Sequence, residues 1–583
     1  MTLLKMPPGV AFGFLSLLYG CSGGSVGQSP SGSGSASSSV STGLPSAPNS
    51  VAITARSSAL DISFVPPTMN GGTPIIDYSA SCSANGQVPV VATNSASPIT
   101  VASLVNGQAY SCTVTARNSA GVGPASSPVT GVPNQSASLT SADIVLGIPT
   151  DTSISATVYS ASLTGSAYIS YGLRSGVYDT QSTAKAIVAG MPTTFTLEGL
   201  KANTRYYYKL YITSDRTGVK QSDSEASFVT SRSSGSTFTF VVQGDSHPER
   251  EKTEFNGDLY TRTLTYAAAD SPDFFITSGD DFSVDTLNAA TIDADAVAQR
   301  YRIQRPYLGI VGRQAPVFLV NGNHEQAARY LLNGTANNVA VWAQNARNAH
   351  YAQPAPDTFY SGNSEVVPYI GLLRNYYAWT WGDALFVVID PYWSSPVAVD
   401  NVFGGGSKTS DSWQITHGDA QYNWLKKTLE TSKAKFKFVF AHHVLGTGRG
   451  GVEVARLYEW GGLNANGSSG FETHRPTWVS PIHNLLAANH VTIFFQGHDH
   501  IWARGVLDGV IYQTLPEPAN PNYNLINADA YAASQTFPNS GYARVTVSPS
   551  EVKVEYVRIW LPSDESADKK SGAVATSYKI TSP

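Results

Sequence analysis

Short runs in which hydrophobic and polar residues alternate dominate the sequence between Pro48 and residue 232. Turn-forming Gly, Pro, Asn and Ser residues separate these runs. A period of two residues bounded by turn residues is typical of β-strands that bury one face. The pattern predicts two all-β sandwich domains, over 48–133 and 137–232.

After Ser236 the hydrophobic pattern changes. Apolar strand-like runs now alternate with helical stretches such as Asp295–Val311 and Asp419–Lys435. Strands that alternate with helices are typical of a layered α/β fold. We therefore predict an α/β domain over 237–562, followed by a C-terminal tail over 563–583.

The first 47 residues do not show the pattern of a folded domain. Lys5 precedes an apolar run, Val10–Leu18, that is too short to span a bilayer, as in a signal peptide. Residues 22–47 are rich in Ser and Gly and contain no charged residue, which is typical of a flexible linker. We predict a signal peptide over 1–21, a linker over 22–47 and export from a bacterial cell.

The cysteines indicate how the exported chain is held. The segment that ends at Cys21, Leu-Tyr-Gly-Cys, resembles a bacterial lipobox, which would anchor the protein through a lipid on Cys21. An ordinary signal peptide cut near Gly24 is the alternative, and the protein would be periplasmic, outer-membrane-anchored or extracellular. Cys82 and Cys112 both lie on predicted strands of the first β-domain. We expect them to form a disulfide in an oxidising compartment, with two buried thiols as the alternative.

Composition and charge exclude several classes of function. The 583 residues carry a formal net charge of −5, so there is no excess of basic residues for nucleic acid or an anionic membrane. All eleven histidines follow residue 246, which places the chemistry in the α/β domain. That domain contains no cysteine, which excludes a thiolate nucleophile and a Cys-rich zinc site there.

Five apolar runs of the α/β domain each end in residues that bind metals. The segments at these ends are Gly244-Asp245-Ser246-His247, Gly279-Asp280-Asp281, Gly322-Asn323-His324-Glu325, Ala441-His442-His443 and Gly497-His498-Asp499-His500. Ligands gather at the carboxyl ends of strands in α/β sheets, so these five segments can converge. Carboxylate and amide oxygens with imidazoles suit Mn, Fe or Zn, and a carboxylate can bridge two ions roughly 3.5–4 Å apart.

In this order the segments resemble the signature blocks of the calcineurin-like metallophosphoesterase superfamily, across about 237–503. The resemblance implies a four-layer αββα domain with two divalent or mixed-valence transition-metal ions (Fe, Mn or Zn). It assigns one ion to Asp245, His247, Asp280 and His500. It assigns the other ion to Asp280, Asn323, His442 and His498, so that Asp280 bridges the two ions.

The same resemblance implies the roles of further residues. His324 would be the catalytic acid or electrostatic group near the leaving oxygen, and Glu325 would orient it. A metal-bridging hydroxide would attack phosphorus directly. Asp281 follows Asp280 at a strand end and is expected to point elsewhere, which excludes a glycosidase-like carboxylate pair.

The β-domains resemble known modules as well. Leu104–Tyr110 and the following segment 116–123 resemble a fibronectin type III domain, and Leu200–Tyr206 repeats the Leu and Tyr of its tyrosine corner. The second sandwich resembles the small β-domain that precedes the catalytic domain of purple acid phosphatases. Those enzymes have glycine where His247 stands and a metal-binding tyrosine where Ser283 stands. We therefore expect a complete metal site that lacks the tyrosinate colour.

Two residues join Asn323 as candidate substrate contacts. His443 either faces the substrate or points away along its strand. Arg449 lies in a Gly-rich segment and either clamps phosphate oxygens or is solvated. His474, His483 and His490 match no block of the family and are expected to be structural.

The resemblance of the second sandwich to the β-domain of purple acid phosphatases implies hydrolysis of phosphate monoesters, with release of inorganic phosphate from a small phosphorylated substrate. A phosphodiesterase that uses the same two-metal site is the alternative, because the ligands alone do not distinguish the two. A third interpretation is a non-enzymatic surface-binding protein with a relic site, but none of the seven ligands is missing. No nucleic-acid partner is expected, and a membrane is reached only through the lipid on Cys21. The oligomeric state stays open.

Overall fold

The computed structural model describes residues 43–582 except 57–58, 85–86, 106–107, 134–141, 217, 219, 401, 405–408 and 445–447. The predicted signal peptide, Cys21 and most of the linker lie outside the described residues. Within the described part of the chain, no helix combines the length and the apolar character needed to cross a membrane.

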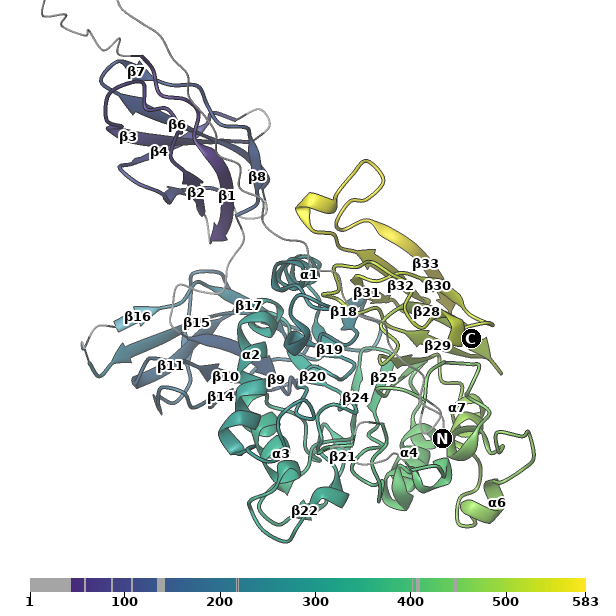
Figure 1. Ribbon diagram of the computed structural model, residues 1–583. Coiled ribbons are helices and arrows are strands. Elements are labelled where there is room, and N and C mark those ends of the chain that lie inside the picture. Colours follow the sequence, from purple (N-terminus) through teal and green to yellow (C-terminus); the bar gives the residue numbers. More distant parts are fainter. Residues whose placement is uncertain are drawn as a thin grey trace, which may run out of the picture.

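The first β-domain is a sandwich of two antiparallel sheets (Figure 1). One sheet has the order β1-β2-β5, and in the other β4-β3-β6-β7 is extended by β8 on β6. The Tyr110 hydroxyl accepts a hydrogen bond from the Val105 N–H at 3.0 Å, which is the predicted tyrosine corner. The strands are β1 Asn49–Arg56, β2 Ala59–Val65, β3 Asp77–Ser83, β4 Val90–Asn94, β5 Ile99–Ala102, β6 Tyr110–Asn118, β7 Gly121–Val122 and β8 Val129–Gly131.

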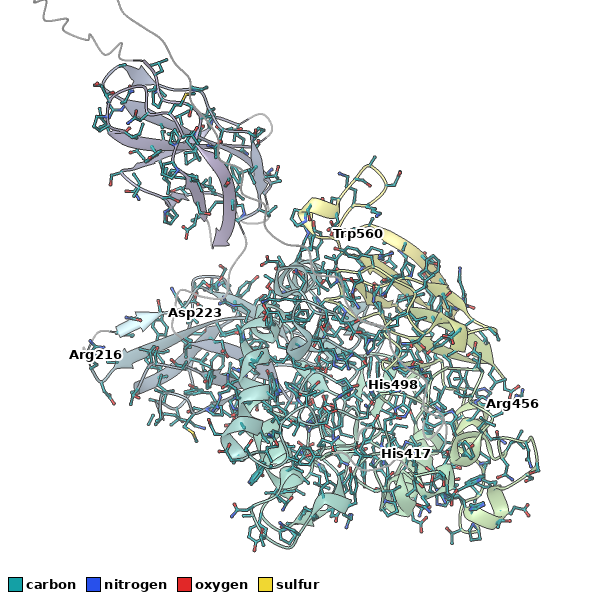
Figure 2. The ribbon with its side chains drawn as sticks, viewed as in Figure 1. Arg216, Asp223, His417, Arg456, His498 and Trp560 are labelled. Carbon is teal, nitrogen blue, oxygen red and sulfur yellow. A yellow bond between two sulfur atoms is a disulfide. The ribbon has the colours of Figure 1, made fainter. Side chains whose placement is uncertain are left out.

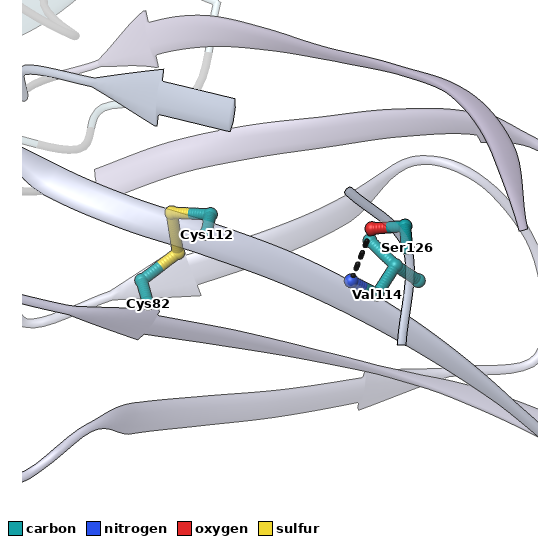
Figure 3. The surroundings of a disulfide bond; sticks show 4 residues. All are labelled: Cys82, Cys112, Val114 and Ser126. Carbon is teal, nitrogen blue, oxygen red and sulfur yellow. Dashed lines mark hydrogen bonds between the residues drawn. A yellow bond between two sulfur atoms is a disulfide. The ribbon is translucent and has the colours of Figure 1, made fainter. Parts of the chain in front are cut away.

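A disulfide joins the two cysteines of this domain (Figure 3). Cys82 on β3 and Cys112 on β6 are directly opposite partners in the antiparallel ladder, and both side chains are buried. The predicted pairing is therefore confirmed.

The second β-domain is also a sandwich, with the orders β14-β10-β9 and β12-β11-β15-β16, to which β13 and β17 add edges. It repeats the tyrosine corner, because the Tyr206 hydroxyl accepts a hydrogen bond from the Lys201 N–H at 2.9 Å. The strands are β9 Asp143–Gly147, β10 Ile154–Tyr159, β11 Gly165–Gly172, β12 Thr180–Gln181, β13 Lys185–Ile187, β14 Thr193–Leu197, β15 Arg205–Ser214, β16 Lys220–Ser222 and β17 Ala226–Val229.

Two mixed sheets form the centre of the remaining domain. The first has the order β20-β19-β18-β31-β32-β33, the second has the order β21-β24-β25-β26-β27-β29-β28-β30, and β22 and β23 form a separate hairpin. The strands are β18 Phe238–Gln243, β19 Phe274–Thr277, β20 Val317–Leu319, β21 Ser361–Gly362, β22 Val366–Val367, β23 Gly371–Leu372, β24 Tyr377–Trp381, β25 Ala384–Val388, β26 Phe436–Phe440, β27 Ile493–Gln496, β28 Trp502–Leu507, β29 Val510–Thr514, β30 Gln535–Phe537, β31 Gly541–Val547, β32 Glu551–Arg558 and β33 Val574–Thr581.

The two sheets pack face to face, with helices outside them. Aromatic residues from both sheets fill the space between, including Phe240 and Phe274 from the first and Phe386 from the second. Helices α1–α3 cover the outer face of the first sheet and α4–α7 that of the second. The helices are α1 Gly257–Ala269, α2 Ala294–Gly312, α3 Val339–His350, α4 Gly418–Thr431, α5 Tyr458–Gly461, α6 Phe471–His474 and α7 Ile482–Ala488. This is the predicted four-layer αββα arrangement.

Two predicted boundaries differ from the structure. Val574–Thr581, within the predicted C-terminal tail, forms β33 and pairs antiparallel with β32, so the sheet continues past residue 562. The helix predicted over Asp419–Lys435 ends at Thr431, because Ser432 is extended and the chain then enters β26.

The second β-domain packs against the α/β domain through a buried ion pair. Arg305 of α2 is fully buried, and its Nε donates to Asp143 Oδ1 at 2.7 Å. Its two terminal nitrogens donate to the carbonyls of His350 and Thr157, at 2.6 and 2.7 Å. All three guanidinium nitrogens are thus paired inside the protein.

Candidate metal centre

The five predicted metal-binding segments converge where strands of both sheets end. Parallel strands β18, β19 and β20 of the first sheet lead to Asp245, Asp280 and Asn323. Parallel strands β26 and β27 of the second sheet lead to His442 and His498. In Figure 2, His498 lies within the α/β domain, whereas Arg456 lies at the outside of that domain and Arg216 lies at the tip of the second β-domain.

One group of side chains gathers around Asp245. Its Oδ2 lies 3.2 Å from His500 Nε2 and 3.9 Å from His247 Nε2. His247 Nε2 is in turn 4.0 Å from Asp280 Oδ2. All four side chains are buried, and the ligand atoms of Asp245, His247 and His500 lie close enough together to hold one metal ion.

A second group shares the Asp280 carboxylate with the first. Asp280 Oδ2 lies 2.9 Å from His442 Nε2. His498 Nδ1 lies 3.3 Å from that same nitrogen and 3.0 Å from Asn323 Oδ1. The structure thus brings together all seven residues that the sequence predicts as ligands, with Asp280 between the two groups.

The charge of this cluster suits cations. Burial would raise the pKa of the Asp280 carboxyl, but the neighbouring His442 and His324 rings hold that pKa well below its usual range. Burial likewise opposes protonation of His442, but Asp280 and Asp245 raise its pKa to about 10. His247 Nε2 is buried and has no hydrogen-bond partner within the described residues, although it faces both carboxylates. The donor set therefore fits a pair of transition-metal ions, which would replace the ring protons.

The backbone at the site is held in an unusual conformation. His247, Asp280, His498 and His500 all have positive φ angles, of 46°, 58°, 68° and 62°. Left-handed backbone is costly for residues with a side chain, and such residues cluster at functional sites. Here four of the predicted ligands adopt it.

Two glycines make room for the carboxylates. A Cβ on Gly322 would lie 2.1 Å from Asp280 Oδ1, and one on Gly497 would lie 2.2 Å from Asp245 Oδ1. No larger residue fits at either position without moving a predicted ligand.

Groups outside the cluster fix the histidine rings. His442 Nδ1 donates to the Ser278 carbonyl at 2.9 Å, and His247 Nδ1 lies 3.0 Å from Glu249 Oε1. His500 Nδ1 lies 3.4 Å from Glu517 Oε2. Such partners orient a metal-binding imidazole and fix its tautomer. The sequence analysis missed both glutamates; Glu249 follows His247 closely, but Glu517 is distant in sequence and gave no signal.

His324 lies at the edge of the cluster and is partly exposed. Its Nε2 is 3.7 Å from Asp280 Oδ2, and its Nδ1 is 2.8 Å from Asp285 Oδ1. Burial would lower the pKa of His324, but Asp280 and Asp285 outweigh it and raise that pKa to about 9. Asp280 and Asp285 therefore favour a protonated ring, and the role of His324 as the acid stays a prediction.

Asp285, which the sequence analysis did not single out, makes the orienting contact expected of Glu325. Glu325 instead accepts hydrogen bonds from backbone N–H groups of Gly322, Asp281 and Phe282, at 2.6, 2.9 and 3.1 Å. Its carboxyl thus links the backbone of the Asp280 segment to that of the Asn323 segment. Glu325 therefore has a structural role and does not orient His324.

His443 and Arg449 occupy positions around His498. The His443 ring stacks on the His498 ring at 4.5 Å, and its Nδ1 lies 2.8 Å from the Tyr392 hydroxyl. Burial and the adjacent His498 lower the pKa of His443 to about 3, so the ring is neutral. Arg449 Nη1 donates to the His498 carbonyl at 2.7 Å and to Asp499 Oδ1 at 2.9 Å. The predicted contacts of both residues with substrate stay predictions.

His247 and Ser283, the two residues that depart from the purple acid phosphatase pattern, lie next to each other. Ser283 Oγ lies 3.4 Å from His247 Nδ1, beside the ring that the family pattern lacks. Asp281 turns away from the cluster, as predicted, and accepts hydrogen bonds from Ser246 Oγ at 2.7 Å and Gln243 Nε2 at 3.1 Å.

Two of the three histidines without a predicted role make structural contacts. His474 stacks on Trp413 at 4.5 Å, and His483 bridges the Tyr512 hydroxyl and Asp508 Oδ2, at 2.8 and 3.0 Å. His490 follows α7 with a positive φ of 53°.

Comparison with known families finds two matching domains. Residues 238–502 match the family described as calcineurin-like phosphoesterase, and residues 46–132 match the fibronectin type III domain. No curated protein matches the sequence.

Two solved structures share the fold. The structure titled "Structure of PhoD" superposes with a TM-score of 0.53 and 14% identity, over 76% of this chain and 90% of that one. A purple acid phosphatase, PPD1 from yellow lupin (Lupinus luteus) seeds, superposes with a TM-score of 0.50 and 16% identity, over 90% of this chain and 92% of that one. At these identities the likeness is one of fold.

Proposed function

Because the chain carries a calcineurin-like phosphoesterase domain behind a fibronectin type III domain, we propose that it is a two-metal phosphatase. The proposed reaction is hydrolysis of a phosphate monoester to an alcohol and inorganic phosphate. The observation that carries this proposal is the Asp280 carboxylate, whose Oδ2 faces His247 on one side and His442 on the other. A carboxylate shared in this way is suited to bridge two ions.

The residues divide the work of the reaction. A pair of ions, when bound, would neutralise the phosphate oxygens and supply an acidified water as nucleophile. That pair would be held by Asp245, His247, Asp280, Asn323, His442, His498 and His500. His324 keeps a proton on Nε2, close to Asp280, and gives it to the leaving alcohol oxygen. Asp285 holds the His324 ring through Nδ1, which leaves Nε2 on the side of Asp280.

The ligand set supports a centre without a tyrosinate. Ser283 offers no phenolate, and His247 supplies an imidazole next to it. We propose an Fe, Mn or Zn pair, with a pH optimum that is not necessarily acidic. A tyrosinate-to-iron absorption band in the protein as purified would contradict this assignment.

The alternative is a phosphodiesterase, because the same centre can hold a diester. Nitrophenyl phosphate and bis(nitrophenyl) phosphate, offered to chelated protein reloaded with Mn, Zn or Fe, separate the two activities. We expect metal-restored cleavage of the monoester, at least about tenfold faster than that of the diester. A preference for the diester would establish the alternative, and no turnover with any metal would favour a binding protein with a relic site.

We also propose that the protein is exported and held at a membrane surface by a lipid on Cys21. The lipobox-like segment and the Ser/Gly-rich linker support this location. Labelling with a radioactive fatty acid in a bacterial host tests it, with Cys21→Ser as the control. Label in the wild type alone is expected, whereas an unlabelled, soluble wild-type chain would indicate ordinary secretion.

A further inference from the structure

Each histidine among the predicted ligands has a second ring nitrogen that faces away from the cluster. In three of the four rings this nitrogen is Nδ1, and it faces a protein oxygen. The oxygens belong to Glu249, the Ser278 carbonyl and Glu517, for His247, His442 and His500 in that order. In His498 it is Nδ1 that lies within the cluster, so Nε2 is the nitrogen that faces outward.

Asp400 lies beside that outward nitrogen. Its Oδ2 is 3.6 Å from His498 Nε2 and 3.5 Å from His443 Nε2. These are ion-pair distances, longer than those of short hydrogen bonds. The Asp400 side chain is largely buried, with 12% exposed. One carboxylate thus lies next to two imidazole rings that stack on each other at 4.5 Å.

Tyr392 lies on the other side of the His443 ring. Its hydroxyl is 2.8 Å from His443 Nδ1, and both side chains are buried. A hydroxyl that donates to Nδ1 leaves the ring proton on Nε2, which faces Asp400. Tyr392 and Asp400 belong to the same segment, between β25 and α4, and line a recess together with Asn323. That segment therefore holds His443 at both ring nitrogens.

The carboxylate that follows His498 in the sequence is engaged elsewhere. Asp499 accepts hydrogen bonds from Arg449 Nη1 and from the Gly450 N–H, both at 2.9 Å, and from the Tyr531 hydroxyl. Its oxygens thus fix the segment around Arg449. Asp400, although distant in sequence, is the carboxylate that faces the His498 ring.

We propose that Asp400 is a positioning residue for the metal ion that is assigned to His498 and Asn323. An imidazole that holds an ion through Nδ1 carries its proton on Nε2. A carboxylate at that nitrogen fixes the orientation of the ring and makes it a stronger ligand. This inference rests on the proposed two-metal function and deepens it.

The proposal also gives His443 a role. Tyr392 and Asp400 hold its ring flat against the His498 ring, so His443 supports the ligand without touching substrate. The segment between β25 and α4 is then coupled to one ion of the pair, because it supplies both Tyr392 and Asp400.

The experiment compares Asp400→Asn and Tyr392→Phe with the wild-type chain. Asp411→Asn is the matched control, because Asp411 lies in the same segment and accepts a hydrogen bond from the Trp413 N–H at 3.0 Å. Asparagine keeps such a cap at the start of a helix. The readouts are the Kd of each manganese ion by calorimetry, the melting temperature of the metal-free protein, and kcat for nitrophenyl phosphate against manganese concentration.

For Asp400→Asn we expect the Kd of one manganese ion to rise about 10- to 100-fold and that of the other to change less than about threefold. The metal-free protein should melt within about 2–4 °C of the wild type. The loss of kcat at low manganese should be recovered at saturating manganese. Tyr392→Phe should weaken the same ion about three- to tenfold, and Asp411→Asn should match the wild type.

Unchanged Kd values for both ions in Asp400→Asn would overturn the proposal. Equal weakening of both ions, together with a lower melting temperature of the metal-free protein, would also overturn it, because Asp400 would then be only structural. If Asp400→Asn does not fold, Tyr392→Phe decides: weakening of one ion supports the proposal, and unchanged Kd values overturn it.

Calorimetry separates these outcomes from failure of the proposed function, because it needs no substrate. Wild-type protein that binds two ions but hydrolyses neither ester would contradict the phosphatase assignment alone. Wild-type protein that binds two ions, with unchanged Kd values in Asp400→Asn, would overturn the role of Asp400 alone.

Discussion

Two regions of this molecule differ in whether their buried polar atoms have hydrogen-bond partners. At the junction of the second β-domain with α2, every guanidinium nitrogen of Arg305 is hydrogen-bonded to a protein oxygen. At the metal centre, by contrast, His247 Nε2 is buried with no hydrogen-bond partner among the described residues, and so is Glu517 Oε1. Arg305 and His247 are both fully buried.

The difference separates a structural network from a binding site. A buried polar group without a partner costs free energy, so folded proteins pair nearly all of them. Arg305 obeys this rule, because none of its guanidinium nitrogens is left over for a ligand. The metal centre keeps one predicted ligand atom, His247 Nε2, unpaired among the described residues and facing the Asp245 and Asp280 carboxylates, which is what a site for cations requires.

Among the variants that test this comparison, we expect the largest effect at Asp280. Asp280→Asn keeps the size of the side chain but removes the charge shared by the two groups. We expect kcat to fall by about a thousandfold or more and bound metal to fall from two ions per chain to one or fewer. Steady-state kinetics and elemental analysis measure this.

Asp281→Asn is the matched control for that variant, because the adjacent carboxylate turns away toward Ser246 and Gln243. It should keep two metal ions and lose less than about tenfold in kcat. Equal losses in the two variants would mean that general disruption, and not a lost ligand, explains the effect.

A second variant fills the space that Gly322 leaves beside the Asp280 carboxylate. In Gly322→Ala the new methyl group meets Asp280 Oδ1, so we expect a large loss of metal affinity, of about 10- to 100-fold. Titration of chelated protein with manganese measures it.

Gly309→Ala on α2 is the control for added volume, since its Cβ would lie 3.7 Å from the nearest atom. A helical glycine replaced by alanine should raise the free energy of unfolding by up to about 1 kcal/mol and leave metal binding unchanged. Normal metal affinity in Gly322→Ala would show that the Asp280 carboxylate is not held as described.

The pH dependence tests the group beside the centre. Protonated His324 is the proposed acid, so activity should decline as pH rises through its pKa. Asp285 helps to raise that pKa to about 9. Asp285→Asn removes this effect and should move the alkaline decline to lower pH, by about one unit. A pH–rate profile whose alkaline limb stays in place would contradict this role of Asp285.

The junction offers the smallest expected effect on catalysis. Asp143→Ala leaves the buried Arg305 without its carboxylate and should lower the free energy of unfolding by about 3–5 kcal/mol. Metal content and kcat of the folded protein should remain within about twofold of the wild type. Denaturant unfolding at fixed metal concentration measures the change. Loss of metal from folded protein would show that the two regions are coupled.

Local sequence predicts much of this site, because each ligand block directly follows an apolar strand. The runs Phe238–Gln243 and Phe274–Thr277 become β18 and β19 without a change of boundary. The residues after them are set by the strand end itself, and the order of the blocks adds the family resemblance. The seven predicted ligands therefore meet in the structure.

Groups that depend on distant packing could not be predicted in this way. Glu517 and Asp285 lie outside every ligand block, and only the folded chain brings them to His500 and His324. The strand β33 was missed for a related reason. Its residues are partly or fully exposed at the sheet edge, so the hydrophobic pattern that marks a buried strand is weak.

The most direct test of the central claim is the number of metal ions that the chain binds. Full-length protein, stripped with chelator and titrated with manganese or zinc in a calorimeter, should bind two ions per chain. Asp280→Asn should bind at most one. Binding of no ion, or a stoichiometry that Asp280→Asn leaves unchanged, would contradict a two-metal centre built around Asp280.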